Sequence, residues 1–283
     1  MGNLKTGRVS MMVPVFNSEP YLHEFLASVE QQDIDDFEII IVNDGSTDGS
    51  ARIIESWTHC IRESKPGWNI IFRSQKNLGP AMAVGNAFSH VTGEYLMWAD
   101  SDDILMPGSV SVRASYLDSH PETGMVYVQA AFMHTADKAF PGIPEGDYDI
   151  LEGLFRGETT CAAGCYMVRT ALLLEAYPDR KIPDSVIGQN LQLLIPAASR
   201  TQCHVLGCLG MLYRIHPGSR SVQPKSFNTH MARINALEKL LISLISHCIC
   251  DGPKYEIIVR ETVQKEKQRL LEQTREAIRK ERI

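Results

Sequence analysis

Hydrophobic positions in the first 135 residues of the chain alternate between two spacings. Short apolar runs at 9–15, 37–43, 69–73 and 94–99 have the length and the branched side chains of strands buried on both faces. Three segments with helical spacing separate these runs. The apolar positions are Leu22, Phe25, Leu26 and Val29 in the first segment and Ile53, Ile54 and Trp57 in the second. The third segment covers residues 77–88. This alternation predicts an α/β fold with a Rossmann-like, mainly parallel sheet covered by helices on both faces.

The pattern is less regular after residue 120. A strand is expected at 125–133, a helix at 170–176, and a further helix that starts near Ser185 with Ile187, Leu191 and Leu194 or Ile195 on its apolar face. We therefore divide the chain into a domain over 1–222, with halves 1–120 and 121–222, and a C-terminal helical extension over 223–283.

The C-terminal extension contains an amphipathic segment, HMARINALEKLLISLISH at 230–247, and nine Lys or Arg against six Glu over 254–283. Such a helix or helical pair is expected to pack on the rest of the chain or on a second subunit, giving a homodimer. The alternative is a peripheral contact with the inner face of a membrane, in which basic side chains meet anionic headgroups. In that case the residues entering the interface would be Leu240, Leu241, Leu244 and Ile245.

Composition narrows the class of protein. The 283 residues are 44% hydrophobic and 22% charged, as in ordinary globular proteins, and the net charge of −6 argues against general binding of nucleic acid. The seven cysteines include no CxxC pair, which favours reduced thiols and argues against a zinc site. The N-terminus lacks a signal-peptide core and no run reaches eighteen apolar residues, so we expect a cytoplasmic protein without a membrane span.

A polar, turn-forming segment follows each of the first four predicted strands: PVFNSE at 14–19, NDGSTDGS at 43–50, QKNLGP at 75–80 and DSDD at 100–103. In parallel sheets ligands bind beyond the carboxyl ends of the strands, so these segments should meet at one crevice. The last segment places three carboxylates, Asp100, Asp102 and Asp103, within four positions. A divalent cation such as Mg²⁺ or Mn²⁺ would neutralise them, whereas a solvated loop is the simpler alternative.

These segments carry a resemblance. VPVFN, IIIVNDGSTDGS, NLGPA and DSDD followed four residues later by Pro107 lie in order within residues 9–107, and together they resemble the nucleotide-binding half of family 2 glycosyltransferases of the GT-A fold. The resemblance implies a nucleotide-sugar donor, a UDP-sugar foremost, and Mn²⁺ or Mg²⁺ as cofactor. It further implies transfer of the sugar to a saccharide or lipid-linked acceptor, usually with inversion, in the synthesis of surface polysaccharide.

The resemblance also implies roles for individual residues. Asp44 would hold the nucleotide base, Asp100 would face the ribose or the sugar, and Asp102 would bind the metal. The loop LYRIHPGSRS at 212–221 is similar to a basic loop of the family, in which Arg214 and Arg220 would meet the diphosphate and His216 would complete the metal shell. The full set expected to bind the nucleotide sugar is Pro14, Val15, Phe16, Asn17, Glu19, Asp44, Asn77, Gly79, Asp100, Ser101, Asp102 and Arg214.

The catalytic base is where the sequence departs from the family. An inverting transfer needs a carboxylate to accept the proton of the attacking hydroxyl, and the family commonly uses the Asp of a Glu-Asp pair. The matching place here reads Gly188-Gln189-Asn190, so we expect Gln189 and Asn190 to bind the acceptor through hydrogen bonds. The nearest upstream carboxylate, Asp184, is the candidate base if the helix starts near Ser185, and the alternative is that it only caps that helix.

Two other functions stay open. A protein that kept the fold but lost its base would bind sugar nucleotides without turning them over. A nucleotidyltransferase would be expected to carry a Gly-rich phosphate loop after the first strand, where this chain has PVFNSE.

Overall fold

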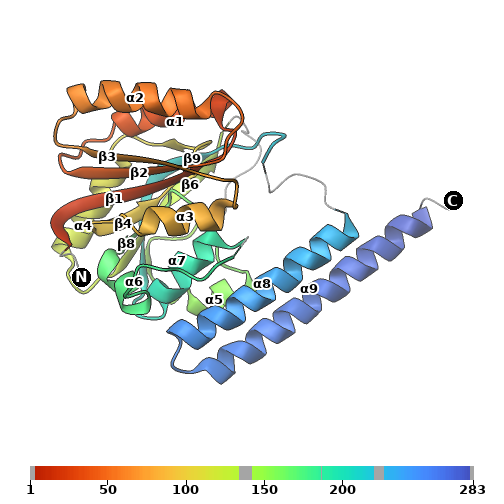
Figure 1. Ribbon diagram of the computed structural model, residues 1–283. Helices are drawn as coiled ribbons and strands as arrows, with labels where there is room; N and C mark the ends of the chain where they lie inside the picture. The colour runs from red at the N-terminus through yellow and green to blue at the C-terminus, as the bar shows by residue number, and fades with distance from the viewer. Residues whose placement is uncertain (1–3, 134–141, 186, 220–225, 281–283) are drawn as a thin grey trace.

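The computed structural model describes residues 4–133, 142–185, 187–219 and 226–280 (Figure 1). All of the strands and helices predicted within the first hundred residues are confirmed, with ends that shift by a few residues. They are β1 (Lys5–Val15), α1 (Glu19–Glu30), β2 (Phe37–Asp44), α2 (Ser50–Ser64), β3 (Asn69–Gln75), α3 (Pro80–Phe88) and β4 (Gly93–Trp98).

The second half of the chain adds shorter strands and a helical cover. Its first elements are β5 (Ile104–Leu105), α4 (Ser109–Ser119), β6 (Met125–Phe132), β7 (Gly146–Tyr148), α5 (Leu151–Arg156) and β8 (Tyr166–Arg169). Its last elements are α6 (Thr170–Ala176), α7 (Gln189–Ala198), β9 (Cys203–Tyr213), α8 (Phe227–Cys248) and α9 (Gly252–Lys280).

The strands form one sheet in the order β3-β2-β1-β4-β8-β6-β9-β5, with β7 paired to β9. Neighbouring strands from β3 to β4 are parallel, as predicted. Beyond β4 the sheet is mixed, because β8 runs antiparallel to both β4 and β6 while β9 is parallel to β6. The parallel part therefore brings the carboxyl ends of β1 to β4 to one edge, which is where the polar segments were expected to meet.

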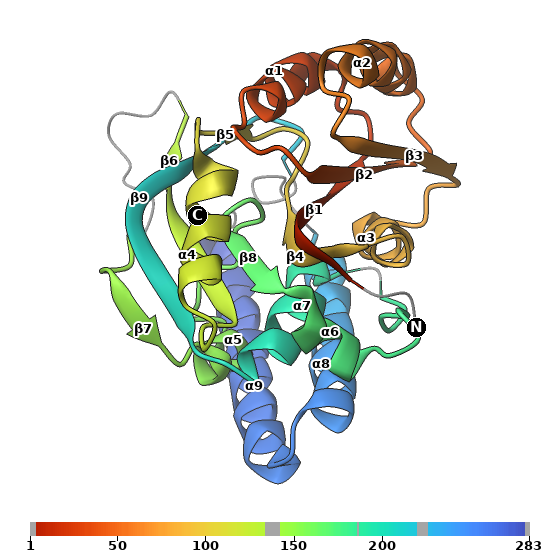
Figure 2. The same cartoon turned by 90° about the vertical axis from the view of Figure 1, so that its left-hand side faces the viewer.

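Helices cover both faces of the sheet, and alternate strand residues point to opposite faces. Met11 and Val13 belong to the hydrophobic cluster beneath α1, α2 and α4, whereas Met12 belongs to the cluster on the other face. The second cluster is covered by α3 and by the helices from α5 onward (Figures 1 and 2).

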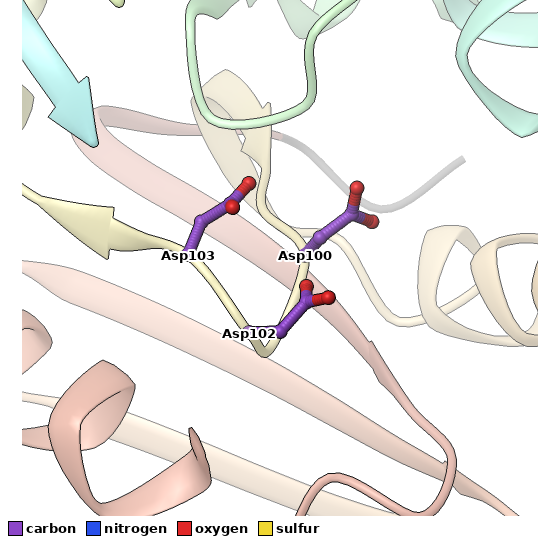
Figure 3. Close-up of side chains that lie close together, drawn as sticks. All are labelled: Asp100, Asp102 and Asp103. Atoms are coloured by element: carbon purple, nitrogen blue, oxygen red, sulfur yellow. The ribbon is translucent and has the colours of Figure 1, made fainter. Parts of the chain in front are cut away.

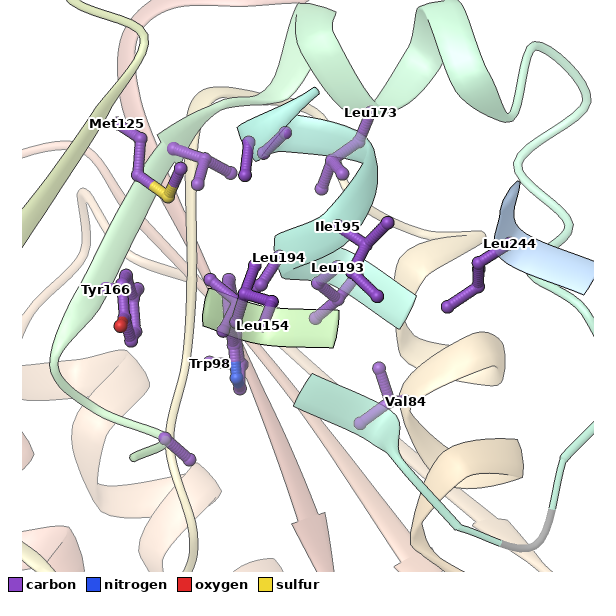
Figure 4. Packing of buried hydrophobic residues seen from close by; sticks show 14 of the residues in the cluster. Val84, Trp98, Met125, Leu154, Tyr166, Leu173, Leu193, Leu194, Ile195 and Leu244 are labelled. Atoms are coloured by element: carbon purple, nitrogen blue, oxygen red, sulfur yellow. The ribbon is translucent and has the colours of Figure 1, made fainter. Parts of the chain in front are cut away.

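The C-terminal hairpin of α8 and α9 shares the second cluster, because α8 packs on α7 and α9 packs on α5 (Figure 2). Figure 4 shows Leu244 pointing toward the same cluster as Leu193, Ile195 and Val84. The four residues considered for a membrane interface, Leu240, Leu241, Leu244 and Ile245, are all 4% exposed or less. Their placement in a membrane is therefore wrong, since the apolar face of α8 is covered by the protein itself, and the expected packing on the core is confirmed.

No helix within the described part of the chain has the length and apolar character needed to cross a bilayer. The predicted boundary at residue 222 divides a continuous hydrophobic cluster, since Leu244 and Ile245 contribute to it together with Val128 and Val168.

Candidate functional site

Three carboxylates meet in the loop that leaves the centre of the sheet. Asp100, Asp102 and Asp103 lie between β4 and β5 (Figure 3), and one oxygen from each lies within 4.8 Å of the others. The loop leads directly into β5 at the far edge of the sheet, where Ile104 pairs with Leu212. The negative cluster predicted from the sequence is therefore present at the end of β4.

Asp103 is the most buried member of the cluster, at 2% exposure. Its Oδ1 accepts a hydrogen bond from the Arg214 backbone N–H at 2.9 Å, and its buried Oδ2 has no hydrogen-bond partner among the described residues. Burial, followed by the neighbouring charges of Asp100 and Asp102, raises the pKa of Asp103 well above its usual range. A cation at this position would relieve the repulsion and give the buried oxygen a partner.

The loop after β9 is fastened to the carboxylate cluster. His216 Nε2 lies 2.9 Å from Asp102 Oδ2, and the His216 ring is centred 4.2 Å from the ring of Tyr21. Arg214 donates from Nε to the Asp102 carbonyl at 2.8 Å, while its guanidinium lies over the Tyr21 ring and pairs with Glu24. The structure therefore brings His216 into contact with Asp102, while its predicted role in a metal shell stays a prediction. Arg220 lies outside the described residues.

The residues present fit a hard divalent cation. Carboxylate oxygens from the cluster and the imidazole nitrogen of His216 are ligand types that Mn²⁺ accepts, and the carboxylates also suit Mg²⁺. Asp102 and His216 could hold such an ion, because their ligand atoms lie 2.9 Å apart.

The loops after β1 and β2 hold each other. Asn17 adopts a left-handed conformation with φ of 50° and accepts a hydrogen bond from the Thr47 backbone N–H at 2.8 Å. Glu19 accepts from the Gly49 backbone N–H at 2.7 Å. Glu19 was predicted to bind the nucleotide sugar directly. In the structure it does not line the cleft and instead holds the loop after β2 through Gly49.

Asp44 organises the loop after β3. Its carboxylate, 2% exposed, accepts hydrogen bonds from the Gln75 side chain and from the backbone N–H groups of Leu78 and Gly79, at 2.8 to 2.9 Å. Gly45 allows the close approach of the two loops, because a Cβ there would lie 2.6 Å from the backbone nitrogen of Asn77. Asp44 borders the cleft, whereas Asn77 and Gly79 support it from behind.

A cleft of about 600 Å³ opens over these strand ends. Ten of the predicted residues line it, namely Pro14, Val15, Phe16, Asn17, Asp44, Asp100, Ser101, Asp102, Gln189 and His216. Further lining residues that the sequence did not single out are Ser18, Tyr21, Pro80, Ile187, Gly188, Tyr213, Gly218, Ser219 and Arg233. Tyr21 could have been found from its place in the first turn of the first predicted helix. Nothing in the sequence marks Arg233, which reaches the cleft from α8.

The helix on the acceptor side does not start where it was predicted. α7 begins at Gln189, and Gly188 precedes it with φ of 74°. The left-handed φ favours glycine here, and a Cβ on Gly188 would lie 2.5 Å from a methyl carbon of Leu240 on α8. Asp184 is exposed, lies five residues before the helix and does not line the cleft. A start near Ser185 is therefore wrong, and Asp184 cannot cap α7.

Asn190 also differs from its predicted role. Its side-chain oxygen accepts a hydrogen bond from Trp98 Nε1 at 2.9 Å, and its side-chain nitrogen donates to the Cys161 carbonyl. Both ends of the amide are thus occupied by the protein, and Asn190 does not line the cleft. Gln189 does line it, so of the two amides predicted to bind the acceptor only Gln189 borders the cleft.

Comparison with known proteins agrees with the geometry. The model of the glycosyl transferase family 2 matches residues 10–174, more than half of the chain. The chain belongs to glycosyltransferase family 2. An uncharacterised glycosyltransferase of Rickettsia bellii is 24% identical over 255 residues, which are 87% of this chain and 33% of that protein.

A second relative has been solved as a structure. The Staphylococcus aureus poly(ribitol-phosphate) beta-N-acetylglucosaminyltransferase TarS is 30% identical over 115 residues, 40% of this chain and 19% of TarS. The crystal structure of TarS 1-349 with UDP-GlcNAc superposes with a TM-score of 0.67 at 20% identity, covering 90% of this chain and 71% of that one. This family 2 chain thus has the GT-A fold, and it spans a third or less of these two relatives.

The mannosyltransferase PcManGT of Pyrobaculum calidifontis, solved with GDP-Man and Mn²⁺, superposes with a TM-score of 0.56 at 18% identity, covering 90% of this chain and 73% of that one. The likeness extends the shared fold to a protein that was solved with a different nucleotide sugar from the UDP-GlcNAc of TarS.

Proposed function

We propose that this family 2 protein transfers a sugar from a nucleotide sugar, a UDP-sugar foremost, to a saccharide or lipid-linked acceptor during the synthesis of surface polysaccharide. The observation that carries the proposal is the carboxylate cluster: Asp100, Asp102 and Asp103 converge, with one buried oxygen lacking a described partner, at the mouth of a cleft built from four strand-end loops. The UDP-GlcNAc, GDP-Man and Mn²⁺ named for TarS and PcManGT support a nucleotide sugar and a divalent metal as ligands.

The parts of the cleft suit different parts of the donor. Pro14 to Asn17 form an apolar and amide-bearing wall for the base, and Asp44 stands beside it. Because the carboxylate of Asp44 already accepts three hydrogen bonds, its role for the base includes holding the 77–79 loop in place. Asp100 and Ser101 lie next to the cluster, where the ribose and the sugar would be held.

Asp102 and His216 would hold Mn²⁺ or Mg²⁺, which when bound would stabilise the negative charge of the departing diphosphate. Arg214 positions this pair, since it donates a hydrogen bond to the Asp102 carbonyl and its guanidinium lies over the ring of Tyr21, which also contacts His216. We include inversion at the sugar carbon in the proposal because transfer in this family is usually inverting. Asp184 as catalytic base stays a prediction, and its exposed position outside the cleft does not support it.

The test is a panel of sugar nucleotides incubated with the protein and Mn²⁺. A glycosyltransferase releases free sugar and nucleoside diphosphate slowly by hydrolysis when no acceptor is present. A protein that binds without catalysis would show metal-dependent binding and no release. A nucleotidyltransferase would instead release pyrophosphate from a nucleoside triphosphate, which would contradict the proposal.

A further inference from the structure

The cleft has a second end, formed by helices instead of strand ends. Ile187, Gly188 and Gln189 line it from the start of α7, and Arg233 lines it from α8. We call these four residues the acceptor end, because the metal-binding carboxylates and the strand-end loops form the opposite end. None of the four carries a carboxylate, so the acceptor end itself supplies no general base.

The carboxylates among the described cleft-lining residues are Asp44, Asp100 and Asp102. Asp44 accepts three hydrogen bonds from its own loop, and Asp102 contacts His216. Asp100 lies in the carboxylate cluster, with an oxygen within 4.8 Å of the other two. All three therefore belong to the donor side, where they are engaged by the protein or placed toward a cation.

A hydroxyl acceptor would have to lose its proton as it attacks, and a positioned base near neutral pH normally removes it. The acceptor end offers a primary amide in Gln189 and a guanidinium in Arg233, neither of which accepts a proton at that pH. An acceptor whose attacking oxygen is already deprotonated would remove the need for a base.

Arg233 is directed toward the cleft by the packing of α8. It precedes Leu240 by seven residues, two helical turns, and so lies on the same side of the helix. Leu240 packs against Gly188, at the start of α7. Arg233 is exposed and forms no ion pair with any residue in the described ranges, so its guanidinium is available to an anionic ligand.

We propose that the acceptor is a phosphate monoester and that Arg233 binds its phosphate, a substrate class that rests on the sugar-transfer function proposed above. The planar guanidinium forms paired hydrogen bonds with phosphate oxygens. A phosphate monoester has its second pKa near about 6 and is therefore largely a dianion at neutral pH. Gln189 lines the same cleft and can donate to a further phosphate oxygen or to another polar group of the acceptor.

The reaction then balances without a base. A phosphate oxygen of the acceptor forms the new bond to C1 of the sugar, and the bond from C1 to the diphosphate oxygen breaks. The electron pair of that bond leaves with the nucleoside diphosphate, and the product is a sugar-phosphate diester. No proton is transferred to or from the protein.

The phosphate could belong to a lipid or to a soluble metabolite, and three probes separate these sources. Farnesyl phosphate represents the lipid, glucose 6-phosphate represents the soluble monoester, and farnesol is the matched alcohol without phosphate. Sugar transfer from each donor in the panel is measured with Mn²⁺. We expect at least about a hundredfold faster transfer to one of the phosphates than to farnesol, the lower end of the factor a general base would otherwise supply.

The variant Arg233→Ala tests the binding role, with Lys239→Ala, another exposed cation on α8 outside the cleft, as its matched control. Arg233→Ala should raise the KM for the phosphate acceptor about tenfold or more while the Kd for UDP stays unchanged, and Arg233→Lys should restore part of the loss. Lys239→Ala should change neither constant.

Three results would overturn the proposal: equal transfer to farnesol and farnesyl phosphate, no acceleration by either phosphate although a donor binds, or a loss of UDP affinity in Arg233→Ala as large as the change in acceptor KM. The failure of every sugar nucleotide to bind would instead overturn the proposed function on which this inference rests.

Discussion

The donor end and the acceptor end of the cleft are built by different means. The donor end comes from residues 9–103 together with His216 in the loop after β9. Its loops are held by short hydrogen bonds, such as those that Asp44 accepts from the Gly79 backbone N–H and Glu19 accepts from the Gly49 backbone N–H. The acceptor end comes from α7 and α8, and the contact of Gly188 with Leu240 brings its two parts together. Hydrogen-bonded loops need particular polar residues in a particular order, whereas packed helices need only suitable shape.

This difference explains why the role of a polar residue follows from its place in the sequence at the donor end but not at the acceptor end. At the donor end, a polar residue in a motif either lines the cleft or holds a loop that does. At the acceptor end, Asn190 follows the cleft-lining Gln189 in sequence, yet its amide is hydrogen-bonded within the protein. Its oxygen accepts from Trp98 and its nitrogen donates to Cys161. Adjacent residues on a helix point in different directions, so neighbourhood in sequence does not give a shared role.

The largest expected effect concerns packing at the acceptor side. Leu244→Ala should lower the free energy of unfolding by about 2 to 5 kcal/mol, the range for a leucine removed from a core, because Leu244 is fully buried on the inner face of α8. Chemical denaturation measures this loss of stability. The control is Ile257→Ala on α9, where the side chain of Ile257 is 58% exposed. Equal losses in the two variants would show that the hairpin is not part of the core.

The next effect concerns the donor end. Asp102→Asn should lower Mn²⁺-dependent nucleotide affinity by at least about a hundredfold, because even a residue that only supports a metal ligand costs up to that factor. The fold should persist, since the change removes one charge from a repelling cluster. Calorimetric titration of UDP with Mn²⁺ measures the affinity, and Asp251→Asn, an exposed carboxylate after α8, is the control. Unchanged Mn²⁺ dependence would mean that Asp102 is not a ligand.

Asp44→Ala should weaken nucleotide binding by about 1.5 to 3 kcal/mol, the range for hydrogen bonds that involve a charged group. It should also reduce thermal stability, because the backbone N–H groups of Leu78 and Gly79 lose their acceptor. Titration with UDP and a melting curve on the same sample separate the two losses. Full affinity would place the base elsewhere in the cleft.

The smallest effect compares two neighbours. Asn190→Ala should cost about 1 to 2 kcal/mol of stability, since it leaves the Trp98 indole N–H without its partner. Gln189→Ala should stay within about 0.5 kcal/mol of the natural protein and instead raise the KM of the acceptor. Denaturation and steady-state kinetics on both variants test this, and a reversal of the two patterns would contradict the assignment.

The strands and helices of residues 9–98 could be predicted because β1, β2 and β4 are buried along most of their length and each connection carries turn residues. The carboxylate cluster could be predicted as well, since parallel strands fix where their ends meet. The link from Asp102 to His216 was expected from the family resemblance. The structure supplies its cause, the antiparallel pairing of β5 with β9.

The acceptor side could not be predicted to the same degree. The apolar spacing of Ile187, Leu191 and Leu194 continues across Gly188, but the helix begins only after Gly188, where the backbone is left-handed and packs against Leu240, more than fifty residues later. The apolar face of α8 likewise has the same pattern whether it meets a membrane or a core. Arg233 reaches the cleft through this packing, so no local sequence signal identifies it.

The most direct test of a metal-dependent nucleotide site at the carboxylate cluster is calorimetric titration of UDP into the natural protein, first with Mn²⁺ and then with EDTA. We expect one molecule of UDP to bind per chain, with an affinity at least about tenfold higher in the presence of Mn²⁺, because the ion would neutralise both the cluster and the diphosphate. Equal affinity under the two conditions would contradict this account.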